Sequence, residues 1–168
     1  LPWHTQELVA RAAPTVQFCK QQHIPCIIND DAEAAALLQA DGVHVGQSDC
    51  SIQQARAILG KSACIGVSAH NLEEARMAQQ GGADYIGCGA VFGSATKQDA
   101  TPLSRETLRT ICQGVSIPVV AIGGITAQNV QQLAGSGIQG IAVVSAIFGQ
   151  PDKTEAARQM HQLANQVC

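Results

Sequence analysis

The sequence is poor in aromatic residues, in charged residues and in basic clusters. Aromatic residues make up 3% of the 168 residues and charged residues 14%, whereas hydrophobic residues reach 46%, so Ile, Val, Leu and Ala must build the core. The net charge of −3 argues against general nucleic-acid binding and against a polybasic membrane contact. No apolar run approaches the roughly 18 to 20 residues of a membrane span. The opening "LPWHTQELVARAAP" also lacks the pattern of a signal peptide.

Seven cysteines are present, an odd number, and none form a C-x-x-C pair. Several lie inside apolar runs, such as "ACIGV" and "YIGCGAV". Cysteines of this kind are typical of small buried hydrophobic side chains in a reducing compartment, rather than of disulfides or zinc ligands. We therefore expect a cytoplasmic protein, and its length and the lack of a linker predict a single domain over residues 1–168.

Short apolar runs alternate with helical patterns along the whole chain. Nearly continuous apolar runs are typical of parallel strands that are covered on both faces. The predicted strands cover 25–29, 42–46, 64–68, 85–91, 118–124 and 140–145. The predicted helices cover 5–22, 32–40, 51–59, 71–80, 104–113, 127–135 and 153–166. Capping residues Ser51, Asn71, Ser104 and Thr126 mark four of the helix starts.

Repeated strand–helix units fit either a doubly wound open sheet or a (β/α)8 barrel. No G-x-G-x-x-G follows the first strand, which weakens the dinucleotide-binding form of the open sheet. The late turns "AIGGIT" and "VVSAIF" favour the barrel, because such barrels often bind phosphate after their last two strands. We predict an α/β chain of TIM-barrel type, truncated to about six strands.

Polar residues follow the predicted strands at the ends that form the functional edge of a parallel sheet. The first strand ends in Asn29, Asp30 and Asp31, and the second leads to Asp49. Carboxylates on neighbouring strands can hold Mg²⁺ together with water and substrate phosphate. The alternative function of such a residue is to cap the following helix, which we expect of Asp31.

Three later segments have the composition of anion-binding loops. "GSATKQD" combines small residues with hydroxyl groups at Ser94 and Thr96 and a cation at Lys97, although a polar surface loop would look the same. Gly123-Gly124 and Ser145 precede turns or helix starts that suit a phosphate, or are simply tight turns.

Two histidines and a serine complete the polar set. His44 alternates with apolar residues and is expected to fill a position in the sheet rather than to act as an acid or base. His70 follows Ser68 closely, but no G-x-S-x-G elbow is present, so a nucleophilic serine is not expected.

The motifs "IINDD", "ADGVHVGQSD", "IGVSAH", "GADYIGCGAVFGSATK", "IPVVAIGGIT" and "GIAVVSAI", taken in order, resemble the thiamine phosphate synthase family over about residues 5–160. The resemblance implies a (β/α)8 barrel. It also implies a Mg²⁺-dependent transferase that joins a pyrimidinylmethyl diphosphate to hydroxyethylthiazole phosphate, giving thiamine monophosphate and pyrophosphate.

The same resemblance implies a role for each matching residue. Asp30 and Asp49 should hold Mg²⁺, Asn29 and Ser68 should contact the pyrimidine, and Lys97 should lie near the diphosphate. The thiazole phosphate should bind at Ser94, Ala95, Thr96, Gly124, Val144 and Ser145. Ser68 and Lys97 are the residues expected to act directly on the reacting substrate.

The chain departs from the family pattern in two places. Ala90 and Ser94 stand where the family has proline and threonine in its P-x-x-x-T-x-T-K loop. No Gln-x-Arg-x-Lys motif precedes "HTQELVARAAPTVQFCKQQ", so the first two family strands are expected to be absent. A tautomerase-like barrel or a non-catalytic phosphate-binding remnant therefore stays an alternative, and the sequence leaves a homo-oligomer open.

Overall fold

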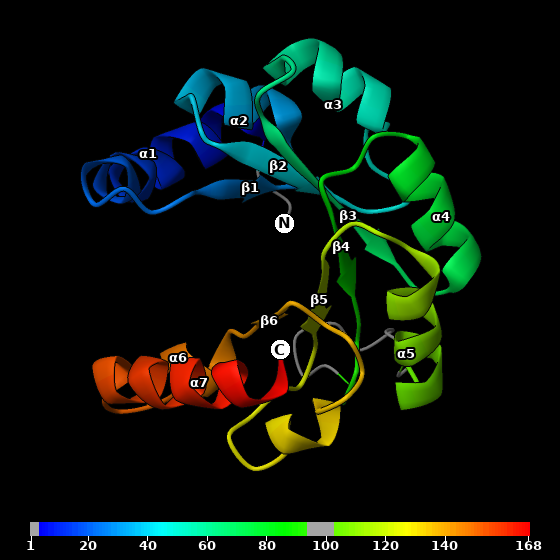
Figure 1. Ribbon diagram of the computed structural model, residues 1–168. Helices are drawn as coiled ribbons and strands as arrows, with labels where there is room; N and C mark the ends of the chain where they lie inside the picture. The colour runs from blue at the N-terminus through cyan, green and yellow to red at the C-terminus, as the bar shows by residue number, and fades with distance from the viewer. Residues whose placement is uncertain (1–3, 94–102) are drawn as a thin grey trace. The chain divides into compact units, whose positions relative to one another are not determined.

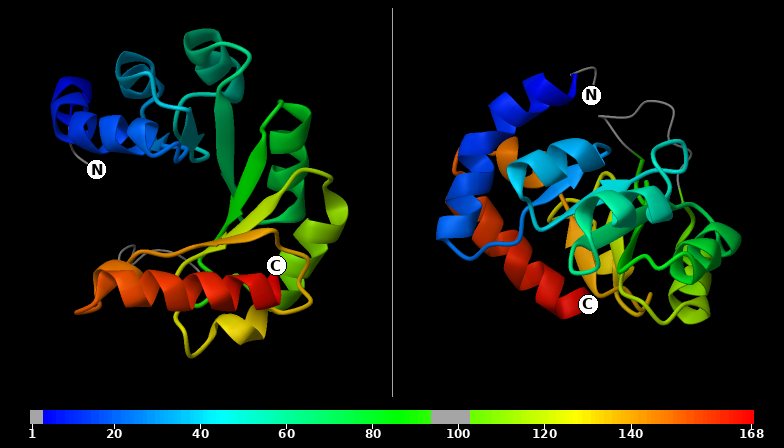
Figure 2. Two further views of the ribbon diagram at one scale, coloured as in Figure 1. Left: turned by 60° about the vertical axis from the view of Figure 1, so that its left-hand side comes forward. Right: turned by 90° about the horizontal axis from the view of Figure 1, so that it is seen from above.

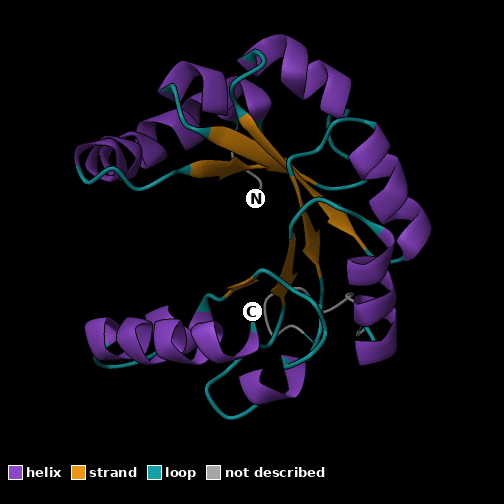
Figure 3. Ribbon diagram, viewed as in Figure 1, coloured by secondary structure: helices purple, strands orange, loops and turns teal. Residues whose placement is uncertain are grey.

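The computed structural model describes residues 4–93 and 103–168, which form two compact units. The first unit takes the chain up to Ser68 together with Gln80–Asp84, and the second takes Ala69–Gln79 and the chain from Tyr85 onward. In both units strands alternate with helices along the chain (Figures 1 and 3). That residues 1–168 form a single domain stays a prediction.

The first unit contains three parallel strands with their helices on one face (Figure 1). In chain order its elements are α1 (Thr5–Gln21), β1 (Ile27–Asn29), α2 (Ala32–Leu38), β2 (Gly42–Val45), α3 (Ile52–Leu59) and β3 (Cys64–Ala69), whose last residue belongs to the second unit. The strands lie in the order β1-β2-β3, with Ile28 paired to Val43 and Val43 to Ile65.

The core of the first unit consists of small and β-branched side chains. Val43, Ile65, Ala34 and Ala35 are completely buried, and Val16 of α1 is nearly so. The small alanines of α2 let this helix approach both α1 and the strands closely. Among the described residues of this unit, no aromatic side chain is buried, as the composition predicts.

The second unit begins with α4 (Leu72–Gln80), whose last residue is assigned to the first unit. It continues with β4 (Tyr85–Cys88), α5 (Arg105–Gly114), β5 (Val119–Ile122), the 3₁₀ helix η1 (Val130–Leu133), β6 (Gly140–Ala142), α6 (Ser145–Phe148) and α7 (Lys153–Val167). The strands are parallel and lie in the order β4-β5-β6.

One hydrophobic cluster holds the second unit together. Ile86 and Ala121 of the strands, Leu108 and Ile111 of α5 and Leu133 of η1 are completely buried in it. The C-terminal helix α7 adds Met160 to the same cluster and lies beside η1 (Figure 2). This packing fixes the turns that follow β5 and β6, which carry the predicted phosphate-binding residues.

Local capping signals predict helix starts well. Ser51 and Gln54 form a complete capping box at α3, and Ser104 accepts the backbone N–H of Thr107 at the start of α5. The predicted cap Asp31 is confirmed, because its Oδ1 accepts the backbone N–H of Ala34 at 2.8 Å. In each case an unsatisfied N–H of the first helical turn receives a side-chain acceptor.

The segment after β5 differs from the sequence-based expectation. A helix over 127–135 with Thr126 as its cap was expected, but only the four residues of η1 are helical and Asn129 precedes them. Gly135 and Gly137 adopt positive φ angles of 75° and 90°, which end the helical run. The last strand is also shorter than expected, and Ser145–Phe148 form the helix α6 instead.

The cysteines are less buried than expected. All seven are free thiols, but only Cys88 is fully buried, Cys168 is exposed, and the other five are partly buried.

Candidate functional site

In the first unit, the strand register aligns polar side chains on one face of the sheet. Asn29 of β1 pairs with His44 of β2, and His44 pairs with Gly66 of β3. Register partners in parallel strands share a face, and so do residues two apart on a strand. Asn29, His44 and Ser68 therefore lie on a common face, at or near the carboxyl ends of three successive strands.

Asp30 follows β1 in an unusual backbone conformation. Its φ of 69° lies in the left-handed region, which Asp tolerates better than most side chains. Its backbone N–H donates to the carbonyl oxygen of His44 at 2.7 Å, so the residue is attached to β2 beyond the end of β1. The neighbouring Asp31 points its carboxylate to the start of α2 and also accepts the hydroxyl of Thr5 at 2.8 Å. The two adjacent acids thus have different surroundings.

Asp49 lies in the loop after β2 and stabilises that loop. Its Oδ2 accepts the backbone N–H of Gly46 at 2.6 Å, while its other carboxylate oxygen, Oδ1, takes no part in that bond. Asp49 is exposed to solvent. Asp30 and Asp49 therefore both follow the carboxyl ends of adjacent parallel strands.

The two carboxylates suit a hard cation. Mg²⁺ is usually bound by one or two carboxylates together with water and substrate phosphates, and Asp30 and Asp49 offer oxygen donors of that kind. Within residues 4–93 and 103–168, no three His, Cys, Asp or Glu side chains gather closely enough to form a complete metal cage.

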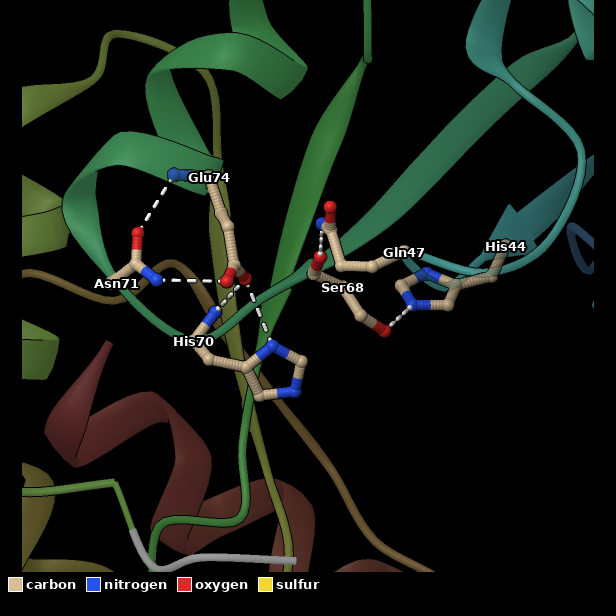
Figure 4. Close-up of polar contacts among 6 residues, drawn as sticks. All are labelled: His44, Gln47, Ser68, His70, Asn71 and Glu74. Atoms are coloured by element: carbon tan, nitrogen blue, oxygen red, sulfur yellow. Dashed lines mark hydrogen bonds and ion pairs between the residues drawn. The ribbon is translucent and has the colours of Figure 1, made fainter.

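Ser68, at the end of β3, is held at two atoms by the β2 segment (Figure 4). His44 Nε2 lies 2.9 Å from the Ser68 hydroxyl oxygen. The side-chain amide of Gln47 donates to the Ser68 carbonyl oxygen at 2.6 Å. Ser68 is partly buried, and both its hydroxyl and its backbone are therefore fixed in direction.

In the second unit, Glu74 forms hydrogen bonds with the polar groups that follow β3. Its Oε2 accepts the backbone N–H of His70 at 2.8 Å and lies 2.9 Å from His70 Nδ1, and its Oε1 accepts the Asn71 amide (Figure 4). Burial raises the pKa of Glu74, but the hydrogen bonds from His70 and Asn71 outweigh it and bring the pKa below its ordinary value. The cluster caps α4, and His70 remains largely exposed.

The turn after β5 is compact because two glycines have positive φ angles. Gly123 and Gly124 have φ angles of 102° and 64°, and a Cβ on Gly124 would lie 2.7 Å from the carbonyl oxygens of Phe92 and Gly93. Asn129 stabilises the turn, since its Nδ2 donates to the Gly124 carbonyl and its Oδ1 accepts the Thr126 N–H, both at 2.8 Å.

Val144 and Ser145 follow β6 at the start of α6. The register pairs Ile122 with Ala142, so Gly124 and Val144 extend their neighbouring strands by the same number of residues. Ser145 also lines a cavity of about 640 Å³ that the Thr126–Gln128 turn, α6 and the start of α7 surround. Three of the predicted phosphate-binding residues thus come from adjacent strand ends of one unit.

Ser94, Ala95, Thr96 and Lys97, the rest of the predicted phosphate-binding set, lie outside the described residues.

His44, Gln47 and Asn129 are polar residues whose contacts the sequence did not reveal. His44 was expected only to fill the sheet; it does occupy a strand, but its ring also contacts Ser68, which is 24 residues away in the chain. The G-Q-S-D stretch after β2 and the N-terminal position of Asn129 before η1 were the available signals.

The parallel strand–helix units define an α/β protein of TIM-barrel type, with polar side chains at the carboxyl ends of its strands. Solved structures of similar proteins support this fold class. The thiamine phosphate pyrophosphorylase of Pyrococcus furiosus is 35% identical with a TM-score of 0.89, over 98% of this chain and 79% of that one. A 3-hexulose-6-phosphate synthase matches 96% of this chain and 84% of its own length with a TM-score of 0.69, and at 17% identity it supports the fold alone. The expected fold class is confirmed.

The family follows from sequence comparison. The family model described as thiamine monophosphate synthase matches residues 2–147. The thiamine-phosphate synthase of Chloroflexus aurantiacus is 44% identical over 96% of this chain and 74% of its own length, and that of Ruminiclostridium cellulolyticum is 51% identical over 84% and 67%. The chain belongs to the thiamine-phosphate synthase family. The predicted family, transferase class and condensation in thiamine biosynthesis are thereby confirmed.

Helices that could cross a membrane are absent from the part of the chain that the structure describes, because none is both long and apolar enough.

Proposed function

We propose that the polar strand ends of the two units carry the two substrates of the thiamine-forming condensation. Asn29, Asp30, Asp49 and Ser68 of the first unit bind the pyrimidinylmethyl diphosphate, and Gly124, Val144 and Ser145 of the second unit bind the phosphate of hydroxyethylthiazole phosphate. The register that aligns Asn29, His44 and Ser68 on one face, beside the two acids, is the observation that carries this proposal.

In the first unit, Asn29 and Ser68 supply neutral hydrogen-bonding groups, which suit an aminopyrimidine ring. Asp30 and Asp49 supply negative charge at the same edge, which would repel a diphosphate on its own. Asp30 and Asp49 would hold Mg²⁺, whose positive charge would offset that repulsion and would stabilise the negative charge of the departing pyrophosphate. The positive φ of Asp30 and its backbone bond to His44 place this carboxylate beyond the end of β1.

In the second unit, the backbone of the Gly124 turn and the start of α6 supply N–H groups and the Ser145 hydroxyl. Glycine at position 124 lets the backbone approach an anion without a side chain in between. We assign Ser94, Ala95 and Thr96 to the same phosphate, and Lys97 to the diphosphate, as the family motif implies.

The reaction needs little proton transfer from the protein. The bond between the pyrimidine methylene carbon and the diphosphate oxygen breaks, and its electron pair leaves with pyrophosphate. The lone pair of the thiazole nitrogen then forms the new C–N bond. Residues that orient the substrates and stabilise the leaving charge are therefore the main contributors to the rate, in keeping with the absence of a general base from the proposed roles.

The test measures thiamine monophosphate and pyrophosphate formed from both substrates with Mg²⁺, and it compares two adjacent acids. Asp30→Asn should reduce Mg²⁺-dependent turnover by at least about a hundredfold, because a metal ligand loses its charge. Asp31→Asn is the matched control, since asparagine caps a helix as well as aspartate does. Equal turnover in wild-type protein and in both Asp30→Asn and Asp49→Asn would refute the metal assignment.

Calorimetry with each substrate separates the synthase from its alternatives. A non-catalytic remnant would bind the thiazole phosphate but not the pyrimidine diphosphate. A tautomerase-like activity would need no Mg²⁺ and would survive Asp49→Ala. Binding of both substrates, with Mg²⁺ required for the diphosphate, supports the synthase.

We also propose a cytoplasmic location, which the free state of all seven cysteines supports, because a reducing compartment keeps thiols unpaired.

A further inference from the structure

We propose that His44 is a positioning residue that orients the Ser68 hydroxyl toward the pyrimidine substrate. The inference rests on the proposed function in one respect, namely that Ser68 contacts this substrate. The contact between the two side chains is itself a feature of the structure, with His44 Nε2 2.9 Å from Ser68 Oγ.

The position of His44 in the sheet favours such a role. Its neighbours Val43 and Val45 point to the opposite face and are buried, as core side chains of β2. His44 points to the same face as Asn29 and Ser68 and is only partly buried. An apolar residue would suffice for sheet packing there, whereas the imidazole makes a polar contact on the face that also carries Asn29 and Ser68.

The local geometry leaves the hydroxyl accessible to the ring. Gly66, the register partner of His44 on β3, has no side chain, so none from that position stands between the imidazole and the hydroxyl two residues further along. The Gln47 amide also fixes the Ser68 backbone, by donating to its carbonyl oxygen. Two residues of the β2 segment therefore restrain both the backbone and the side chain of Ser68 (Figure 4).

A serine hydroxyl has one donor and two acceptor directions, and it rotates to suit its partners. Once the imidazole takes one direction, the remaining ones are set before the substrate arrives. Pre-orientation of this kind improves substrate binding because less freedom is lost on association. The tautomer of His44 decides whether the hydroxyl donates to the substrate or accepts from it.

Two replacements of His44 isolate the contact. Glutamine can place a polar group where Nε2 lies, whereas the side chain of asparagine is too short to do so. With saturating thiazole phosphate, His44→Asn should raise KM for the pyrimidine diphosphate by about five- to tenfold, the change expected from losing one hydrogen bond. His44→Gln should recover most of that loss. The KM for thiazole phosphate should stay unchanged in both variants, and His161→Gln, an exposed histidine of α7, serves as the control.

The decisive experiment is a double-mutant cycle with Ser68→Ala. If His44 acts through Ser68, His44→Asn should have no further effect on KM once the hydroxyl is gone. An undiminished effect in the Ser68→Ala background would assign His44 a purely structural role and overturn the inference, as would a wild-type KM in His44→Asn.

A spectroscopic measurement keeps this result separate from the proposed function. The ¹⁵N resonance of His44 Nε2 should shift in Ser68→Ala and should shift again when the pyrimidine diphosphate is added to the wild-type protein. Absence of condensation product would refute the proposed function. A His44 Nε2 resonance that shifts neither in Ser68→Ala nor on addition of the diphosphate would refute the positioning role.

Discussion

Asn129 fastens the turn that carries Gly124: its Nδ2 donates to the Gly124 carbonyl oxygen at 2.8 Å, and its Oδ1 accepts the Thr126 N–H at the same distance. A single side-chain amide thus joins two backbone groups of the turn between β5 and η1. Because both ends of the amide are used, no other residue type of this size can make the two bonds.

Asn129→Ala should lower the free energy of unfolding by about 1–2 kcal/mol, since two backbone groups lose their partner. Asn129→Asp should retain the bond to Thr126 and lose the one to Gly124, where a carboxylate would face a carbonyl oxygen. Urea denaturation measures stability, and calorimetry with thiazole phosphate tests the phosphate site proposed at this turn. Unchanged values in both variants would show that the turn is held elsewhere.

Gly124→Ala tests the close approach in the same turn. A Cβ there would lie 2.7 Å from two carbonyl oxygens at a φ of 64°. Gly135→Ala is the matched control, because its φ of 75° is similar but no atom lies within 4 Å of the added carbon. Both variants should lose about 1–2 kcal/mol of stability from left-handed backbone strain, and Gly124→Ala should lose about 1–3 kcal/mol more from the steric clash. Equal losses would contradict the clash.

The same turn shows where sequence-based prediction succeeds and where it fails. Asp31 was predicted as a cap because capping depends on four consecutive residues. The helix expected over 127–135 was wrong because Asn129 uses its side chain to bond nearby backbone groups, which competes with helix formation, and because two glycines follow η1. Both effects depend on conformations that periodicity does not reveal.

The candidate site was predictable only in part for a related reason. Asn29, Asp30 and Asp49 could be predicted because they follow predicted strands, and the functional edge of a parallel sheet follows from its topology. The contact of His44 with Ser68 follows instead from the register of β2 against β3, which hydrophobic patterning leaves undetermined.

Arg56 connects the start of β3 with the segment before β4, all within the first unit. Its guanidinium donates to the carbonyl oxygens of Ala63 and Gly82 and lies 2.9 Å from Asp84 Oδ2, which also accepts the Ile65 N–H. Arg56→Lys should cost about 1–2 kcal/mol of stability, because an ammonium group cannot reproduce the planar fork of donors. Thermal unfolding measures it, with Arg109→Lys on the exposed side of α5 as the control. Wild-type stability in Arg56→Lys would show that one donor suffices.

The loss of folding stability at acid pH should depend on Glu74. The hydrogen bonds from His70 and Asn71 bring its pKa below the ordinary value of 4.5 despite burial. A carboxyl group with a lowered pKa in the folded state stabilises the fold above its unfolded pKa and loses that contribution as the pH falls through the folded pKa. Glu74→Gln should therefore flatten the loss of stability below about pH 4.5. Glu73→Gln in the same turn is the control. If Glu74→Gln lost stability at acid pH as steeply as the wild-type protein does, the assignment would be contradicted.

Cys88 and Cys168 should differ sharply in reactivity. Burial, and then the nearby Cys112 and Glu74, raise the pKa of Cys88 to about 12, so its thiolate is scarce at pH 8. Partial burial also raises the pKa of Cys168, but this C-terminal residue is exposed to reagents. A short pulse of iodoacetamide, followed by mass spectrometry of peptides, should label Cys168 first and leave Cys88 unmodified. Urea above the unfolding midpoint should make both react at similar rates. Rapid labelling of Cys88 in the native protein would mean that β4 opens often enough to expose its core-facing thiol.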